Sequence, residues 1–165
     1  MPLRSIKYLV VVGVLLYTSF TTSLHAQAGK LPPFRVLQTN GKVFKAQDLP
    51  IGKPIVIIYF SPDCDHCDVM TKEMMKQPEK YKKASVAMVT YLPVDQVGKF
   101  VQKHGLAKLS NFYVGTEGTS FFLRNYYKLN KMPFLALYTK NGDLVKSYTD
   151  ESGMPQLVKQ LSTLK

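Results

Sequence analysis

The feature that most constrains this chain is a pair of cysteines, Cys64 and Cys67, with two residues between them. An apolar run at 55–60 precedes the pair, and a segment with helical spacing of apolar residues follows from about 65 to 76. Such a run is typical of a strand buried on both faces of a parallel sheet. We therefore expect the cysteines where a central strand ends and a helix begins.

This position favours thiol chemistry. The free backbone N–H groups and the positive dipole end of a helix stabilise a thiolate, whose ordinary pKa is about 8.5. Cys64 would be the attacking thiol and Cys67 the resolving one. The loop between them is too short to constrain the unfolded chain much, so we expect redox chemistry or metal binding rather than a structural disulfide.

The first 28 residues are expected to be a signal peptide. Arg4 and Lys7 form a basic start, 8–20 is apolar, and Ala26-Gln27-Ala28 fits a cleavage site. The apolar run is shorter than the ~20 residues that cross a bilayer, so an uncleaved membrane anchor is the alternative. We expect one domain at 29–165, exported to the periplasm of a bacterium.

Composition supports a single globular domain, with 45% hydrophobic and 20% charged residues in a chain of 165. The net charge is +11, and Arg4 and Lys7 account for two of these charges, which leaves +9 for 29–165. The lysines are scattered, and only Lys80, Lys82 and Lys83 approach a run. We interpret the excess as a solvated basic surface and expect no nucleic-acid partner.

The other segments alternate in a way that predicts an α/β fold with parallel strands. On the buried side of the first helix, Met70 and Met74 join Cys67, as core residues rather than copper ligands. The remaining expected elements are a hairpin turning at Asn40-Gly41, a strand at 85–92, a helix at 95–104 with Asp95 near its cap, a short strand at 111–114, a turn at 115–118, a helix at 119–127, strands at 134–139 and 144–148 about Asn141-Gly142, and a helix at 154–164.

Three stretches resemble the thioredoxin superfamily, in particular its exported TlpA/ResA-like, redoxin-type branch. They are the strand, Cys-x-x-Cys and helix of 55–74, the segment 132–138 followed by Asn141-Gly142, and the lead-in of 31–34 with 40–42. The resemblance implies a thioredoxin-like fold: a central mixed sheet flanked by helices, with an N-terminal β-hairpin. An extra strand and helix would be inserted before the cis-proline strand.

The resemblance also implies the chemistry. It identifies Met132–Pro133 as the cis peptide bond, with the backbone of Met132 pairing with the substrate polypeptide. It implies a thiol–disulfide oxidoreductase without a bound cofactor, in which Cys64 and Cys67 act on protein thiols or disulfides in an exported compartment. A membrane-bound or soluble donor, which the sequence does not identify, would supply the enzyme with electrons. The resemblance to this branch slightly favours the reductase direction.

The residues around the dithiol leave its redox potential open. A protonated His66 would stabilise a thiolate, whereas the carboxylates of Asp63, Asp65 and Asp68 oppose one. The acid that the family often buries near the second cysteine is missing, because its two usual positions hold Ile58 and Met70. Glu73, one turn further along the helix, is a candidate substitute.

A peroxiredoxin-type peroxidase is one alternative. It would need a hydroxyl three residues before its reactive cysteine and an arginine nearby; Ser61 meets the first condition, and Arg124 is a candidate for the second. The immediate Cys-x-x-Cys spacing and the strand after Pro133 argue against it.

A redoxin-like copper-delivery or other metal-binding module is the second alternative, with Cys64, Cys67, His66 and an aspartate as ligands. Neighbouring His66 and Cys67 cannot easily face one ion together, so we assign no metal site. His104 is the other histidine of 29–165 and is expected on the surface near a helix end.

Overall fold

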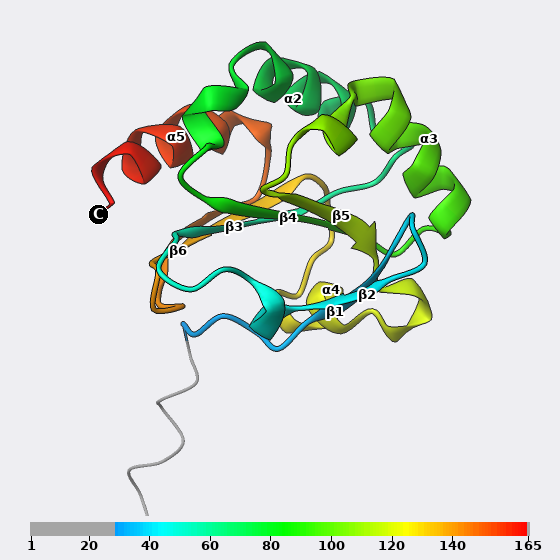
Figure 1. Cartoon of the computed structure of the whole chain (residues 1–165), viewed down its shortest axis with the longest axis horizontal. Coiled ribbons are helices and arrows are strands. Elements are labelled where there is room, and N and C mark those ends of the chain that lie inside the picture. The colour runs from blue at the N-terminus through cyan, green and yellow to red at the C-terminus, as the bar shows by residue number, and fades with distance from the viewer. Residues whose placement is uncertain (1–28, 165) are drawn as a thin grey trace, which may run out of the picture. The chain divides into compact units, whose positions relative to one another are not determined.

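The computed structural model describes residues 29–164, and the predicted signal peptide lies outside them. Residues 31–164 form a seven-stranded mixed sheet in the order β2-β1-β5-β4-β3-β6-β7 (Figure 1). The strands are β1 (Arg35–Gln38), β2 (Val43–Lys45), β3 (Ile55–Tyr59), β4 (Ser85–Thr90), β5 (Phe112–Thr116), β6 (Phe134–Tyr138) and β7 (Leu144–Tyr148). This confirms the predicted fold class, including the N-terminal hairpin that turns at Gly41.

Helices cover both faces of the sheet. Figure 1 shows α2, α3 and α5 on one face and the short α4 on the other. Their bounds are α2 (Asp65–Lys76), α3 (Val94–His104), α4 (Phe122–Tyr126) and α5 (Met154–Thr163). None of the helices within 29–164 combines the length and the apolar character that crossing a bilayer requires.

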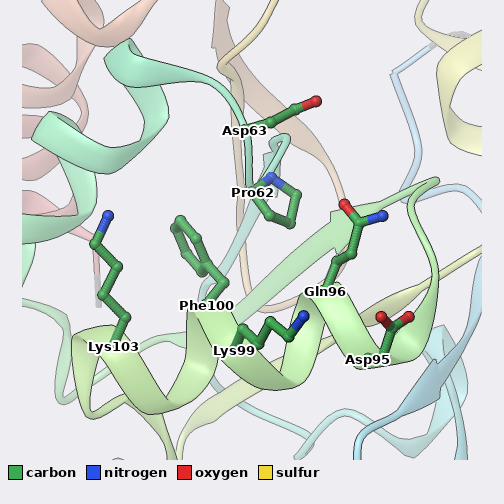
Figure 2. A pocket seen from close by; sticks show the side chains of 7 residues that line it. All are labelled: Pro62, Asp63, Asp95, Gln96, Lys99, Phe100 and Lys103. Atoms are coloured by element: carbon green, nitrogen blue, oxygen red, sulfur yellow. The ribbon is translucent and has the colours of Figure 1, made fainter.

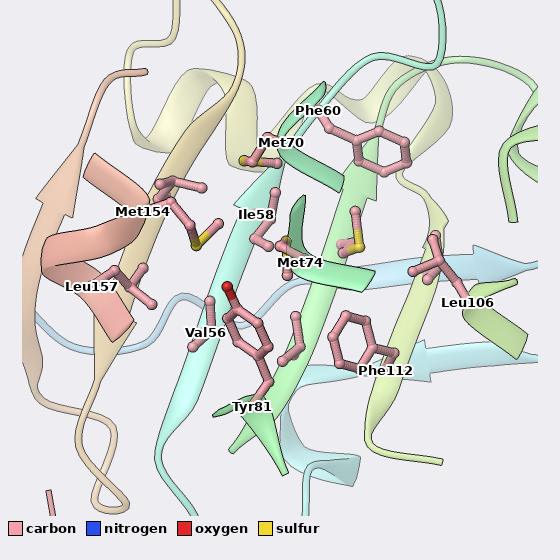
Figure 3. Close-up of a cluster of buried hydrophobic side chains, with 14 of the residues drawn as sticks. Val56, Ile58, Phe60, Met70, Met74, Tyr81, Leu106, Phe112, Met154 and Leu157 are labelled. Atoms are coloured by element: carbon pink, nitrogen blue, oxygen red, sulfur yellow. The ribbon is translucent and has the colours of Figure 1, made fainter. Parts of the chain in front are cut away.

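The apolar run of β3 is buried on both sides, as the sequence predicts. Val56 and Ile58 face the core beneath α2, where Met70 and Met74 pack against them (Figure 3). The alternate residues, among them Tyr59, face the second core beneath α4. Side chains that point alternately to two covered faces explain why this strand has no polar positions.

Two neighbours of β3 define the end of the sheet where the cysteines lie. β4 runs parallel to β3, and β6 runs antiparallel to it, with Tyr59 opposite Phe134. The chain leaving β3 towards Cys64 therefore lies beside the chain entering β6 from Pro133. Because of this strand order, two segments that are far apart in the sequence meet at one end of the sheet.

The segment before β6 contains a strand and a helix, as predicted, but with different bounds. Gly115 belongs to β5 rather than to a turn, because it pairs with Gln38 of β1 on one side and with Val89 of β4 on the other. β1 lies so close that a Cβ at this position would be 2.7 Å from the carbonyl oxygen of Leu37. The helix starts later than expected, after a 3-10 turn at Gly118–Ser120 and Phe121, whose φ is 46°. Its five residues correct the predicted helix of 119–127.

The start of α3 agrees with the prediction to within one residue, and Asp95 lies near the cap as expected. Pro93 is the N-cap residue, and Asp95 lies within the first turn without capping the helix. A carboxylate in the first turn still interacts favourably with the helix dipole, which accounts for an acidic residue at this position.

Candidate functional site

The dithiol lies at the N-terminus of α2, as expected. Cys64 is the N-cap residue with extended backbone angles, and its sulfur accepts a hydrogen bond from the backbone N–H of Cys67 at 3.3 Å. The Cys67 thiol donates to the Cys64 sulfur at 2.8 Å, and both cysteines are free thiols. The cap therefore aims one helix N–H and one thiol at the Cys64 sulfur.

The two sulfurs differ in environment. Cys64 is half-buried, whereas Cys67 is fully buried in the core under α2. Burial chiefly, and then the hydrogen bond to Cys64, raises the pKa of the Cys67 thiol far above its ordinary value. Of the two, Cys64 is the sulfur that another molecule can reach, and Cys67 keeps its proton at neutral pH.

The peptide bond between Met132 and Pro133 is cis, which confirms the prediction. The Met132 carbonyl oxygen lies 3.7 Å from the Cys64 sulfur, although 68 residues separate them in the chain. Met132 is half-buried and contacts both hydrophobic cores. The predicted meeting of the cysteine loop and the proline loop is therefore present.

His66 contacts a residue that the sequence did not indicate. Its Nδ1 atom lies 2.6 Å from a carboxylate oxygen of Glu151, and the imidazole is otherwise 70% exposed. Glu151 opens the 3-10 turn Glu151–Gly153 before α5, 85 residues away in the chain. No local motif marks it, so only the three-dimensional structure brings it into the site.

The three aspartates near the cysteines have different surroundings. Asp63 accepts a hydrogen bond from the Ser61 hydroxyl, and Asp65 is exposed in the first turn of α2. Asp68 pairs with Lys72 at 2.6 Å and with Lys103. The hydrogen bond from Lys103, and then that from Lys72, holds the pKa of Asp68 well below its ordinary range. Its charge is thus balanced locally, which weakens the predicted opposition to a thiolate.

The expectation of a surface position for His104 is wrong. Its side chain is 2% exposed, its Nε2 atom lies 2.9 Å from Asp68, and its ring packs on Phe100. Burial lowers the pKa of His104, and the Asp68 carboxylate opposes this only in part. The last turn of α3 lies against α2, so a helix end that looks exposed in the sequence is covered.

Ile58 and Met70 are both buried in the core, where relatives often place an acid. Glu73, the candidate substitute, does not replace that acid: its side chain is 59% exposed and pairs with Lys76 at 2.5 Å. It lies off the buried side of α2, which carries Cys67.

Residues of the two alternative functions have other partners. The Ser61 hydroxyl donates to Asp63, and the Arg124 guanidinium lies 5.2 Å from the ring centroid of Tyr91. Within 29–164, no group of three or more His, Cys, Asp and Glu side chains is arranged to hold a metal ion.

A hollow of about 410 Å³ opens beside the cysteine loop (Figure 2). Pro62 and Asp63, the two residues before Cys64, form one wall, and one side of α3 forms the other. The lining residues from α3 are Asp95, Gln96, Lys99, Phe100 and Lys103. A polar concave surface next to an accessible thiol offers space for a side chain of a bound molecule.

Comparison with known families agrees with this geometry. The thioredoxin-like domain family matches residues 49–162, and the chain belongs to that family. A search of curated protein sequences found no match.

Solved structures share the fold. A candidate thioredoxin from Neisseria meningitidis is 24% identical, with a TM-score of 0.66 over 82% of this chain and 89% of its own. A secreted Mycobacterium tuberculosis disulfide oxidoreductase, homologous to E. coli DsbE, is 17% identical, with a TM-score of 0.63 over 78% and 96%. The peroxidoxin BcpB of the same organism is 9% identical, with a TM-score of 0.70 over 83% and 97%. These structures show that the fold is shared, and the family match supports the enzyme class expected from the sequence, a thiol–disulfide oxidoreductase.

Proposed function

We propose that the protein exchanges thiols and disulfides with polypeptide substrates, with Cys64 as the attacking residue and Cys67 as the resolving one. The observation that carries the proposal is the unequal sulfur pair: a half-buried Cys64, 2.8 Å from a fully buried Cys67 and beside the carbonyl of Met132. Of the two sulfurs, only that of Cys64 can be reached by a substrate. The Cys67 sulfur lies close enough to attack Cys64 and release a bound substrate.

The reaction balances as follows. The Cys64 thiolate attacks one sulfur of a substrate disulfide, the substrate S–S bond breaks, and the leaving sulfur departs as a thiolate that takes a proton from water. Cys67 then loses its proton, attacks the Cys64 sulfur and releases the second substrate thiol. The substrate gains two electrons and the enzyme ends with a Cys64–Cys67 disulfide; the reverse sequence oxidises a dithiol.

Substrate backbone would pair with Met132, which precedes β6 and is half-buried beside Cys64. An extended peptide that hydrogen-bonds to an exposed backbone segment places its own sulfur by main-chain contacts, which are independent of its sequence. The hollow next to Asp63 would take a neighbouring side chain of the substrate.

The reductase direction is the one we favour. The imidazole of His66, which lies between the two cysteines in the sequence, pairs with the carboxylate of Glu151, so the thiolate gains little extra stabilisation from that ring. A less stabilised reduced form means a more reducing couple. An exported location fits the leader-like sequence of 1–28.

Insulin reduction tests the exchange reaction. We expect turnover by the protein beginning at residue 29, none by Cys64→Ser, and no turnover but one stoichiometric mixed disulfide by Cys67→Ser. The mixed disulfide forms because the accessible thiol remains and nothing displaces the substrate. Turnover that survives Cys64→Ser would overturn the assignment. Peroxide consumption that survives Cys67→Ser would instead indicate the peroxidase.

A further inference from the structure

The pair between Glu151 and His66 reaches into the dithiol from a different part of the chain. His66 lies between the two cysteines, and Glu151 lies in the turn that joins β7 to α5. Of the contacts that Glu151 makes, the 2.6 Å approach to the imidazole Nδ1 atom joins opposite charges whenever the ring is protonated.

The turn that carries Glu151 is fixed in place. The Asp150 carboxylate caps it by accepting a hydrogen bond from the Ser152 backbone N–H at 3.0 Å. Gly153 packs so tightly on β7 that a Cβ would lie 2.3 Å from the Cβ and Cγ atoms of Tyr148. Only glycine allows this approach, so the position of Glu151 is determined by its neighbours and not by the salt bridge alone.

The same turn also faces the proline loop. Asp150 lies 3.9 Å from the ammonium group of Lys131, the residue before Met132. The segment 150–153 thus has charged contacts with both sides of the dithiol, the start of α2 and the loop before β6. The other acidic residues of the cysteine loop and the first turn of α2 are Asp63, Asp65 and Asp68, and Asp68 pairs with Lys72 and Lys103.

We propose that Glu151 is a positioning residue that holds the His66 imidazolium in an internal ion pair and so withholds its positive charge from the Cys64 thiolate. The inference rests on the exchange function proposed above and names the residue that regulates its potential. An unpaired imidazolium beside a thiolate stabilises the reduced form and makes a couple oxidising. A carboxylate of equal and opposite charge cancels that effect.

The net charge that remains near Cys64 predicts a different effect for each variant of this pair. Loss of the carboxylate leaves net positive charge near Cys64, loss of the imidazole leaves net negative charge, and loss of both restores neutrality. If the two single substitutions merely loosened the turn, both would change the reactivity and the redox equilibrium of the dithiol in the same direction. Opposite shifts that compensate therefore identify the ion pair.

The experiment compares Glu151→Gln, His66→Gln and the double variant, with Glu151→Asp as the conservative control. Two readouts are used: the rate of alkylation of Cys64 at pH 7, with the modified residue identified by mass spectrometry, and the equilibrium constant with glutathione. We expect Glu151→Gln to raise the alkylation rate and to favour the reduced form by about two- to fivefold, the range for a partly exposed pair. His66→Gln should change both in the opposite direction, and the double variant and Glu151→Asp should stay close to the unsubstituted protein.

Shifts of the same sign in both single variants, or no shift in Glu151→Gln, would overturn the proposal. Alkylation needs no substrate turnover, so it reports on the ion pair even if insulin is not reduced. Failure of the exchange function would appear as missing turnover with the alkylation pattern intact. Thermal unfolding of each variant shows that the turn remains folded.

Discussion

At the scale of single residues, the dithiol depends on burial as much as on charge. Cys67 is protonated because it is buried, whereas Cys64 sits at a helix end with one side open. Two thiols of one short motif thereby take different roles. The same contrast separates Asp68, whose charge is balanced by lysines, from its partner His104, whose ring is buried against Phe100.

His104 predicts a pH dependence of stability. Burial lowers its pKa below the ordinary 6.5, so the unfolded chain binds a proton in a range where the folded protein does not. Stability is complete above pH 6.5 and falls as the pH drops below it, by at most about 1.4 kcal/mol per pH unit for one proton. Asp68, Lys72 and Lys103 are the charges that face the ring.

Urea unfolding at pH 7.5 and pH 5.0 measures the effect. His104→Gln should flatten the dependence in this range. Asp68 affects stability in a separate range. Folding lowers its pKa from an ordinary value near 4, so the stability from its ion pairs is lost only as the pH falls below about 4. An unchanged slope in His104→Gln would contradict the assignment.

At the scale of elements, α4 depends on one buried carboxylate. Glu117, just after β5, accepts hydrogen bonds from the backbone N–H of Leu123 at 2.7 Å and from the hydroxyl of Tyr59 at 2.6 Å. Burial, together with this hydrogen bond, raises the pKa of Tyr59 far above its ordinary value. Glu117 thus joins the first turn of α4 to the central strand on the face opposite α2.

Tyr59→Phe tests this link. The variant keeps the ring but leaves a buried carboxylate short of one donor, so we expect a loss of about 1–3 kcal/mol in the free energy of unfolding. Urea denaturation measures it. Tyr113→Phe is the matched control, because that ring stacks on Phe44 and should lose little with its hydroxyl. Equal losses in the two variants would show that the hydroxyl of Tyr59 has no special role.

The sequence was sufficient for elements whose signal is local. The apolar run of β3, the spacing of α2, the Asn40-Gly41 turn and the strand after Pro133 all predict their structures. The segment between α3 and β6 was harder, since Gly115 lies in a strand through its pairing with β1 and β4, which are distant in the sequence. Likewise, nothing near Glu151 or His104 in the chain indicates which residue each one meets.

At the scale of the whole molecule, the described residues from 31 onward form one compact unit. We predict that a chain beginning at residue 29 folds fully, because among residues 29–164 both hydrophobic cores are built from positions 31 onward. Circular dichroism and thermal unfolding should match the longer chain within error. A large fall in the melting temperature of the shorter chain would show that the leader contributes to folding.

The position of β3 between β4 and β6 has a further consequence for repeated cycles of oxidation. Its amides are hydrogen-bonded on both sides, so native-state deuterium uptake there should be among the slowest in the protein. The cysteine loop begins one residue after this strand, so the disulfide can form and break while the strand beneath it stays rigid. Damage that accumulates over many catalytic cycles would therefore affect the loops at this end of the sheet before it affects the strands.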